Sequence, residues 1–250
     1  MGDTLVDTSE PLGPVEIHVK VREIINTYFK GNKNQKKALD AASGNGYMTR
    51  WLIENGFDVV ALDITNNNWK LPEVKSHYSD FNKRIEASDE TFDLLVSIET
   101  IEHLENPFLF IRELSRVAKP GGIVIITTPN VHSIRSRLKY FFYGMPRLFE
   151  YIKNDNMGQH ISPISIGQFL YAFRTSNLTI IDVFSAGAKP PFVVSMVFSL
   201  LNYCVLLSLR IMRAKSRVNS DHYLNILSHK QLKELNREGF LIVVAQKDNL

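Results

Sequence analysis

Short apolar runs recur along this chain, and each is separated from the next by a stretch with helical spacing. These strand-like runs fall at 36–42, 58–64, 75–81, 92–98, 121–129, 178–186 and 240–247. The runs at 58–64, 92–98 and 121–129 are continuously apolar, as expected for strands that helices cover on both faces. Strands that alternate with helices in this way predict a parallel, doubly wound α/β sheet.

The first of these runs ends in a glycine turn. Ser43-Gly44-Asn45-Gly46 follows it directly, and a helical pattern then begins. Glycine lets backbone N–H groups approach a ligand, because it accepts unusual backbone angles and has no side chain to block the approach. A dinucleotide site would place a third glycine where this chain has Thr49, so the motif argues against a nicotinamide cofactor.

Carboxylates stand at the ends of the first strands. Asp40 ends the first run, where its charge would repel a pyrophosphate and attract an ammonium group. Asp63 ends the second, where an acidic residue hydrogen-bonds the hydroxyls of a ribose. Ser79 and Asp80 follow the third, at the expected place of an adenine amino group. S-adenosylmethionine combines these features, although a purely structural role for Asp40 as a cap of the turn stays open.

Four segments in this order resemble the motifs of class I S-adenosylmethionine-dependent methyltransferases. They are the turn from Asp40 to Gly46, Asp63, "FDLLVSIETIEHLENP" and "ELSRVAKPGGIVIITTPN". Within the class, the chain is similar to ubiquinone-biosynthesis O-methyltransferases and to small methyltransferases of bacterial surface-glycan assembly. The resemblance covers about residues 20–187 and the last strand, 240–247. It implies a Rossmann-like sheet of seven strands in which the last strand runs antiparallel.

The resemblance also implies the cofactor and the reaction. The residues expected to bind S-adenosylmethionine lie at the ends of the first four strands and are Asp40, Ala42, Gly44, Gly46, Asp63, Ile64, Ser79, Asp80, Ser97 and Ile98. We expect an enzyme that methylates a hydroxyl of a small-molecule, glycan or lipid-linked acceptor. Two alternatives stay open: a quinone-pathway O-methyltransferase that acts at the membrane, and a methyltransferase-like binding protein that has lost turnover.

Candidate catalytic residues follow the fourth strand. Glu99, Glu102 and His103 would share one face of a helical turn. In one hypothesis His103 or Glu102 is a general base for the acceptor hydroxyl. In a second, the same three residues bind a divalent cation such as Mg²⁺, and His132 or His160 completes the site. In a third, Glu102 and His103 only cap and pack the helix while Glu99 contacts the cofactor.

We expect a single domain over residues 1–250, with three parts that do not follow the alternation. Residues 1–14 are predicted to be a loose leader, 130–164 a cover over the substrate, and 190–238 a helical insertion. Basic and aromatic residues interleave in the cover, which suits an acidic or lipid-linked acceptor. A solvated helix face with Phe141 and Phe142 packed inward is the alternative. RNA is ranked lower, because no accessory RNA-binding domain is present.

The insertion before the last strand holds an uncharged run at 192–209, which reaches the lower length limit of a membrane span. A single span is disfavoured, because the strands on both sides of the run belong to one sheet. A basic cluster follows directly and suits anionic lipid headgroups: Arg210, Arg213, Lys215 and Arg217. We therefore expect attachment to an anionic membrane surface, while a buried helix, a homodimer contact and a re-entrant element stay open.

Composition sets the remaining expectations. The net charge is +3 at a pI near 8.8, too weakly basic to indicate a nucleic-acid partner. The single cysteine, Cys204, cannot form an intramolecular disulfide, which fits a reducing compartment. Residues 1–14 lack the features of a secretory signal peptide. We expect a cytoplasmic protein, with peripheral attachment at the inner face of a membrane as an open addition.

Overall fold

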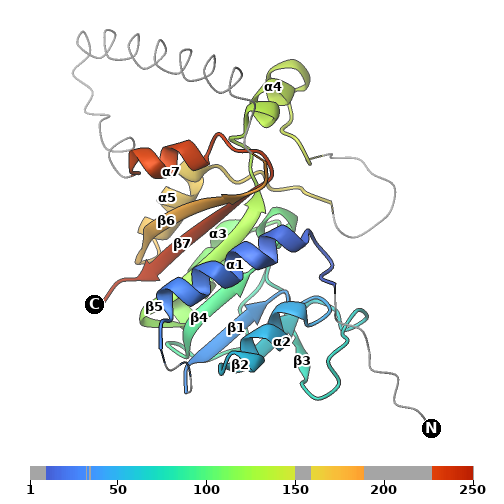
Figure 1. The fold of residues 1–250 in the computed structure, drawn as a ribbon, viewed down its shortest axis with the longest axis vertical. Coiled ribbons are helices and arrows are strands. Elements are labelled where there is room, and N and C mark those ends of the chain that lie inside the picture. Colours follow the sequence, from blue (N-terminus) through green and yellow to red (C-terminus); the bar gives the residue numbers. More distant parts are fainter. Residues whose placement is uncertain (1–9, 32, 34, 150–158, 189–226, 250) are drawn as a thin grey trace.

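The computed structural model describes residues 10–31, 33, 35–149, 159–188 and 227–249. Within them, helices and strands alternate as the apolar runs predict (Figure 1). The elements in chain order are α1 (Val15–Tyr28), β1 (Lys37–Ala41), α2 (Tyr47–Glu54), β2 (Asp58–Asp63), β3 (Ser76–Tyr78), β4 (Phe92–Ser97), η1 (Ile101–His103), α3 (Pro107–Val117), β5 (Ala118–Pro129), α4 (Ile134–Tyr143), α5 (Ile166–Arg174), β6 (Leu178–Ala186), α7 (His229–Glu234) and β7 (Phe240–Lys247).

The described strands form one seven-stranded sheet in the order β3-β2-β1-β4-β5-β7-β6. Strands β1 to β5 pair in parallel, whereas β7 lies antiparallel between β5 and β6. The prediction of a Rossmann-like sheet with an antiparallel last strand is therefore confirmed. Because the carboxyl ends of β1, β2 and β4 meet at one edge, the residues that follow these strands lie together there.

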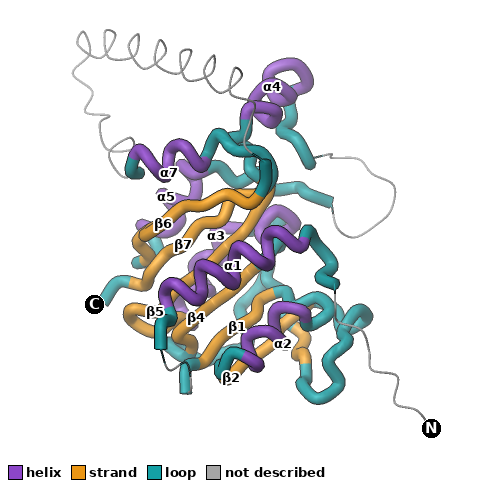
Figure 2. The backbone as a smooth tube through the Cα atoms, viewed as in Figure 1, coloured by secondary structure: helices purple, strands orange, loops and turns teal. Residues whose placement is uncertain are grey.

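Helices cover both faces of the sheet. Helices α1 and α2 pack on one face, and α3 and α5 pack on the other (Figures 1 and 2). Adjacent residues of β4 show why the apolar runs are continuous. Leu94 packs in the cluster that includes Ile25 of α1, while Leu95 packs in the cluster that includes Phe110 of α3. All four side chains are fully buried, because successive residues of a strand face opposite sides.

Some boundaries differ from the prediction. The weakly apolar run at 75–81 forms a strand only over Ser76–Tyr78, at the edge of the sheet, before the backbone turns at Asp80. Glu99 adopts a left-handed backbone angle, with φ of +51°, and only Ile101–His103 form a short 3₁₀ turn. The helical face predicted for Glu99, Glu102 and His103 is therefore not formed, because an α-helix cannot run through a residue with that angle.

Parts of the predicted organisation fall outside the described residues. These parts are the leader up to residue 9, 150–158 of the cover, and the uncharged run and basic cluster at 192–217. Among the described helices, none has the length and apolar character needed to cross a membrane.

Candidate functional site

The glycine turn after β1 is built from left-handed backbone angles. Ala42, Gly44 and Gly46 have φ of +67°, +57° and +88°. A Cβ atom added to Gly46 would lie 3.2 Å from both Leu71 and Trp69, and the φ of this residue would strain any side chain there. Helix α2 begins at the next residue. The turn thus leaves the backbone next to a cavity without side chains in the way, as the sequence predicts.

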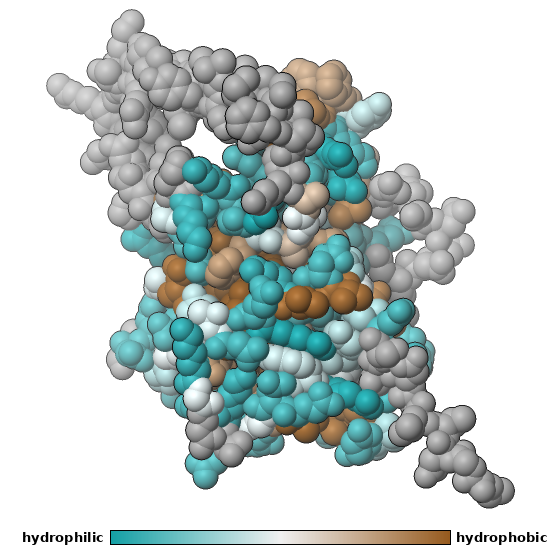
Figure 3. Space-filling model, in the orientation of Figure 1, coloured by the Kyte–Doolittle hydropathy of each residue, from teal (hydrophilic) through white to brown (hydrophobic). Residues whose placement is uncertain are grey.

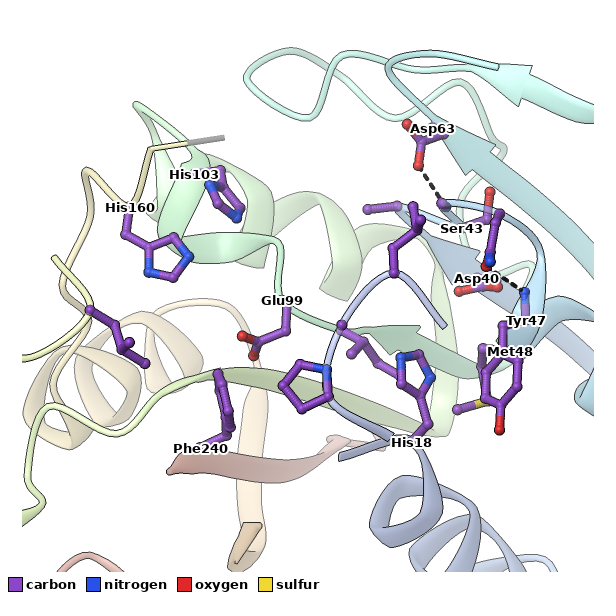
Figure 4. A pocket seen from close by; sticks show the side chains of 18 residues that line it. His18, Asp40, Ser43, Tyr47, Met48, Asp63, Glu99, His103, His160 and Phe240 are labelled. Atoms are coloured by element: carbon purple, nitrogen blue, oxygen red, sulfur yellow. Dashed lines mark hydrogen bonds between the residues drawn. The ribbon is translucent and has the colours of Figure 1, made fainter. Parts of the chain in front are cut away.

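Asp63, at the end of β2, is tied to this turn. Its Oδ2 accepts the backbone N–H of Gly44 at 2.8 Å, and its Oδ1 accepts that of Thr65 at 3.0 Å (Figure 4). The side chain is nearly buried yet lines the cavity. Each carboxylate oxygen keeps a second lone pair, so the group can accept further hydrogen bonds from hydroxyls.

Asp40 is buried beside the turn, and Thr49 stands where a dinucleotide motif would have its third glycine. The Thr49 hydroxyl donates to Oδ2 of Asp40 at 2.5 Å. Burial raises the pKa of Asp40 to about 6, while the Thr49 bond opposes the rise and the charge of Asp63 adds to it. A cationic group in the cavity would stabilise the ionised form of this carboxyl.

Two adjoining cavities cover the carboxyl edge of β1, β2 and β4. One, of about 470 Å³, lies against Asp40, Ser43 and the start of α2. The other, of about 880 Å³, lies against Ile64 and Asp80. They share Leu12, Ala42, Asp63, Glu99 and His103, so they are two halves of one site. An elongated ligand can extend from the end of β3, past Asp63, to the glycine turn.

Of the other residues predicted to meet the cofactor, Ile64, Asp80 and Ile98 line these cavities. Ile98 lines the smaller one, and Ile64, which is half exposed, lines the larger. Ser79 and Ser97 are buried, and their hydroxyls have no hydrogen-bond partner in the described part of the chain. Asp80 accepts the N–H of Asn82 at 3.0 Å, which, with its bond to Lys83, lowers its pKa. Neither serine lines the two cavities, so the structure does not place these hydroxyls against a ligand.

An acidic pair follows β4. Glu99 donates its backbone N–H to the Thr127 hydroxyl at 3.0 Å, and that hydroxyl donates back to Oε1 of Glu99 at 3.1 Å. Glu102 is fully buried. Burial raises the pKa of Glu102 to about 8, and burial together with the charge of Glu102 raises the pKa of Glu99 well above its usual value. Glu102 therefore favours the protonated form at neutral pH, and the pKa of Glu99 is shifted in the same direction.

Two histidines adjoin this pair. The rings of His103 and His160 lie 4.7 Å apart between centroids, and one side-chain atom from each of Glu102, His103 and His160 lies within 4.8 Å of the others. Nδ1 of His103 lies 3.0 Å from the carbonyl oxygen of Gln159. A carbonyl only accepts, so Nδ1 carries the proton and Nε2 of the neutral ring keeps its lone pair.

His132, the other histidine kept open by the sequence, is not part of this cluster. Its Nε2 accepts the backbone N–H of Ile166 at 2.8 Å, and burial lowers its pKa to about 4. The structure thus brings His160, and not His132, to Glu102 and His103. Figure 4 shows His160 beside His103. The sequence does not predict which histidine joins Glu102 and His103, because the choice depends on how the segment at 159–162 packs on η1.

Sequence reasoning missed His18 of α1. Its ring lines the smaller cavity and packs edge-on against Tyr47 at 5.1 Å, and its buried Nδ1 has no partner among the described residues (Figure 4). Burial, with a contribution from Arg22, lowers the pKa of His18 to about 4. The helix pattern places this residue on the buried face, but no motif marks it as part of a site.

The end of the predicted leader also reaches the site. The Asn45 side chain donates to the backbone oxygen of Glu10 at 2.8 Å, and Leu12 lines both cavities. Residues 10–14 therefore contact the site, whereas their composition predicts a loose leader.

Comparisons with known proteins agree with this arrangement. A family model described as "Methyltransferase domain" matches residues 16–183. A ubiquinone biosynthesis O-methyltransferase from Rickettsia typhi is 29% identical over 134 residues, which are 50% of this chain and 53% of that protein. One from Aliivibrio fischeri is 31% identical over 112 residues, 41% of this chain and 47% of that protein. The chain thus spans about half the length of the curated relatives that it matches.

Solved structures share the fold. A SAM-dependent methyltransferase from Archaeoglobus fulgidus has a TM-score of 0.54 at 17% identity, with 92% of this chain and 93% of that chain covered. Phosphoethanolamine N-methyltransferase 2 from Haemonchus contortus, solved in complex with S-adenosyl-L-methionine, has a TM-score of 0.54 at 17% identity, with 92% and 53% covered.

Proposed function

Because this chain belongs to the methyltransferase domain family, in the class that uses S-adenosylmethionine, we propose that it is an O-methyltransferase. Its acceptor would be a hydroxyl of a small-molecule, glycan or lipid-linked compound. One observation carries the proposal. The imidazole of His103, whose Nε2 has no hydrogen-bond partner among the described residues, lines the same cavity as Asp40 and Asp63. A hydroxyl acceptor is the kind of nucleophile that needs a base there.

The cavity walls fit the cofactor. Asp63 would accept the ribose hydroxyls, and Asp80 and Ile64 would flank the adenine. Asp40 lies at the glycine turn, where its charge would favour the ammonium group. When bound, S-adenosylmethionine supplies a methyl group already activated on a sulfonium.

His18 is our candidate for the cofactor carboxylate. The cavity wall near Asp40 needs a donor that can face an anion, and the buried Nδ1 of His18 is unpaired there. A neutral imidazole can donate one hydrogen bond from whichever nitrogen carries the proton. Arg22, stacked 4.3 Å from the Tyr47 ring centroid, adds positive charge behind it.

The chain's own part in catalysis is to hold the acceptor and take its proton. The Gln159 carbonyl fixes the His103 ring so that Nε2 can accept the proton of the acceptor hydroxyl. Glu102, which is favoured in the neutral form, would not compete for that proton. Leu148 and His160 belong to the predicted cover, 130–164, and line the cavity beside His103. We propose that they position the acceptor.

The test is methyl transfer from labelled S-adenosylmethionine to extracted lipid-linked glycans, to quinone precursors, and to no acceptor. Transfer to glycans supports the proposal, and transfer to quinone precursors supports the membrane-bound alternative. Tight cofactor binding with no transfer to any acceptor would favour the non-catalytic binding protein. The variant His103→Ala tests whether the methylated product comes from this chain or from a contaminating enzyme. If it comes from this chain, the variant should form no product, although its affinity for the cofactor is unchanged.

A divalent cation is the second candidate for this site, favoured by the closeness of Glu102, His103 and His160. Two imidazoles and one carboxylate suit a transition metal better than Mg²⁺, which prefers oxygen ligands. Calorimetric titration of the protein with Mn²⁺, Zn²⁺ and Mg²⁺, repeated on His160→Ala, tests binding apart from activity. Heat of binding that His160→Ala abolishes would support the metal, and its absence for all three ions would reject it.

A further inference from the structure

The last turn of α4 carries four exposed aromatic side chains in succession. Tyr140, Phe141, Phe142 and Tyr143 are 61%, 80%, 71% and 75% exposed. Four successive residues go fully around a helix of 3.6 residues per turn, so no side of this turn packs on the described part of the protein. The alternative in which Phe141 and Phe142 pack inward is therefore wrong. In Figure 3 brown and tan atoms lie at the upper end of the described part of the molecule, where Figure 1 labels α4.

The chain around this turn is positively charged. Residues 130–149 contain Arg135, Arg137, Lys139 and Arg147 and no acidic residue. Arg147 lies 3.7 Å from Glu238, but Arg135 and Lys139 form no ion pair within the described residues. Exposed aromatics flanked by unpaired cations are the composition of helices that lie in a bilayer interface.

We propose that α4 docks the protein on an anionic lipid bilayer, with its aromatic turn inserted at the boundary between headgroups and acyl chains. A helix that fills a groove of a partner protein shows its anchors in one stripe, at i, i+3, i+4 and i+7. Here the aromatics point in every direction around one turn. A lipid phase that surrounds the turn can contact all four aromatic side chains, whereas a groove can contact only those on one side of the helix. Arg135 and Lys139 then face the anionic headgroups.

The proposed docking surface, which is the aromatic turn of α4 with Arg135 and Lys139, lies close to the candidate site along the chain. Gly144 ends α4 with a φ of +72° and donates its N–H to the Tyr140 carbonyl at 2.8 Å. The chain then returns to Leu148, which lines the cavity with His103. Resting on the proposed function, this placement narrows the acceptor to an amphiphile whose hydroxyl is presented at a membrane surface. A docked enzyme would meet such an acceptor without extracting it fully from the bilayer.

The aromatic part of the surface is tested by flotation of the full chain, without cofactor or acceptor. The vesicles are phosphatidylcholine alone, or phosphatidylcholine mixed equally with phosphatidylglycerol. Phe141→Ser with Phe142→Ser should lower the affinity for mixed vesicles by about tenfold or more, because two apolar groups no longer leave water. The matched control is Tyr78→Ser with Tyr171→Ser, two aromatics that are 64% and 62% exposed elsewhere. It should bind as the native chain does.

The charge is tested by Arg135→Gln with Lys139→Gln, which should weaken binding to mixed vesicles by about tenfold or more. Both sets of side chains are exposed or half-exposed, so equal melting temperatures check that the fold is kept. Native protein that stays off mixed vesicles, or a phenylalanine variant that binds them like the native chain, would overturn the proposal. So would a native dimer that the phenylalanine variant dissociates, because α4 would then be a contact between copies.

The experiments can reject the proposed O-methyltransferase activity and the proposed docking of α4 independently of each other. Vesicle binding does not depend on methyl transfer, so binding with no transfer to any acceptor would support docking and reject the proposed enzyme. Transfer to acceptors with no binding to either vesicle would reject docking and keep the enzyme.

Discussion

The backbone N–H of Gly44 donates to Oδ2 of Asp63 at 2.8 Å, so the glycine turn after β1 is fastened to the end of β2. This bond gives Asp63 two tasks. It holds the turn in shape, and it leaves carboxylate lone pairs facing the cavity for a ribose. A change at Asp63 should therefore weaken both the ligand site and the turn.

Asp63→Ala should lower the affinity for S-adenosylhomocysteine by about 1–3 kcal/mol, because hydroxyls of the ligand and the N–H of Gly44 lose their acceptor. Asp63→Asn keeps one carbonyl acceptor, so this variant should lose less affinity than Asp63→Ala. Isothermal calorimetry measures both. The control is Asp58→Ala on the same strand, whose side chain is 62% exposed. Affinity that is unchanged in Asp63→Ala would remove Asp63 from the cofactor site.

His103→Ala should lower kcat by about 10²–10⁴ while the affinity for the cofactor changes little, because only the proton acceptor is lost. Steady-state kinetics with the identified acceptor, together with calorimetry, separate the two effects. His77→Ala, an exposed histidine on β3, is the control. Full activity of His103→Ala in the presence of a chelator would contradict both the base and the metal hypotheses.

His18→Ala should weaken binding of S-adenosylmethionine by about 10- to 150-fold, because a hydrogen bond to a charged group contributes about 1.5–3 kcal/mol. The same change should leave the affinity for decarboxylated S-adenosylmethionine unaltered, because that ligand lacks the anion. Glu16→Ala, on the exposed face of α1, is the control. Equal losses for both ligands would mean that His18 supports the wall of the cavity and does not face the carboxylate.

The stability of the ligand-free protein should fall as pH rises through the range where Asp40 ionises. Asp40 has a pKa of about 6 in the folded chain, raised by burial from 3.8. The folded chain thus holds this proton more tightly than the unfolded chain. The resulting stability is complete below pH 3.8 and is lost as pH rises through about 6. The loss is about 3 kcal/mol at 1.36 kcal/mol for each pKa unit.

Urea unfolding of the native chain and of Asp40→Asn, at about pH 4 and about pH 7, isolates this contribution from the other carboxyls. The free energy of unfolding of the native chain should fall relative to the variant between the two conditions. A difference that does not change with pH would show that Asp40 titrates normally.

Sequence reasoning predicted the parts of this protein that depend on neighbours along the chain. Apolar periodicity predicts the strands, because burial on both faces leaves a continuous run such as 92–98. The turn at Gly44 and the carboxylates that end β1 and β2 follow from the same local patterns. The antiparallel β7 came from the resemblance alone, since no local pattern encodes strand direction.

The parts that failed or stayed open depend on contacts between distant segments. The choice of His160 over His132 is made by the packing of 159–162 on η1, where two backbone N–H groups bond the Glu102 carbonyl. The loss of a helical face at Glu99 follows from its bond to Thr127 of β5. The exposure of Phe141 and Phe142 could not be predicted, because an apolar side chain is normally expected inside.

The position of β7 has a consequence for synthesis of the chain. Residues 240–247 form β7, which pairs with both β5 and β6. Before this segment leaves the ribosome, the strand that joins β5 to β6 is missing. During translation, one edge of β5 and the whole of β6 stay open to pairing with other nascent chains. Completion of the sheet is thus a late event, and a ribosome that stalls before residue 240 would expose a ready aggregation edge to the chaperones of the cell.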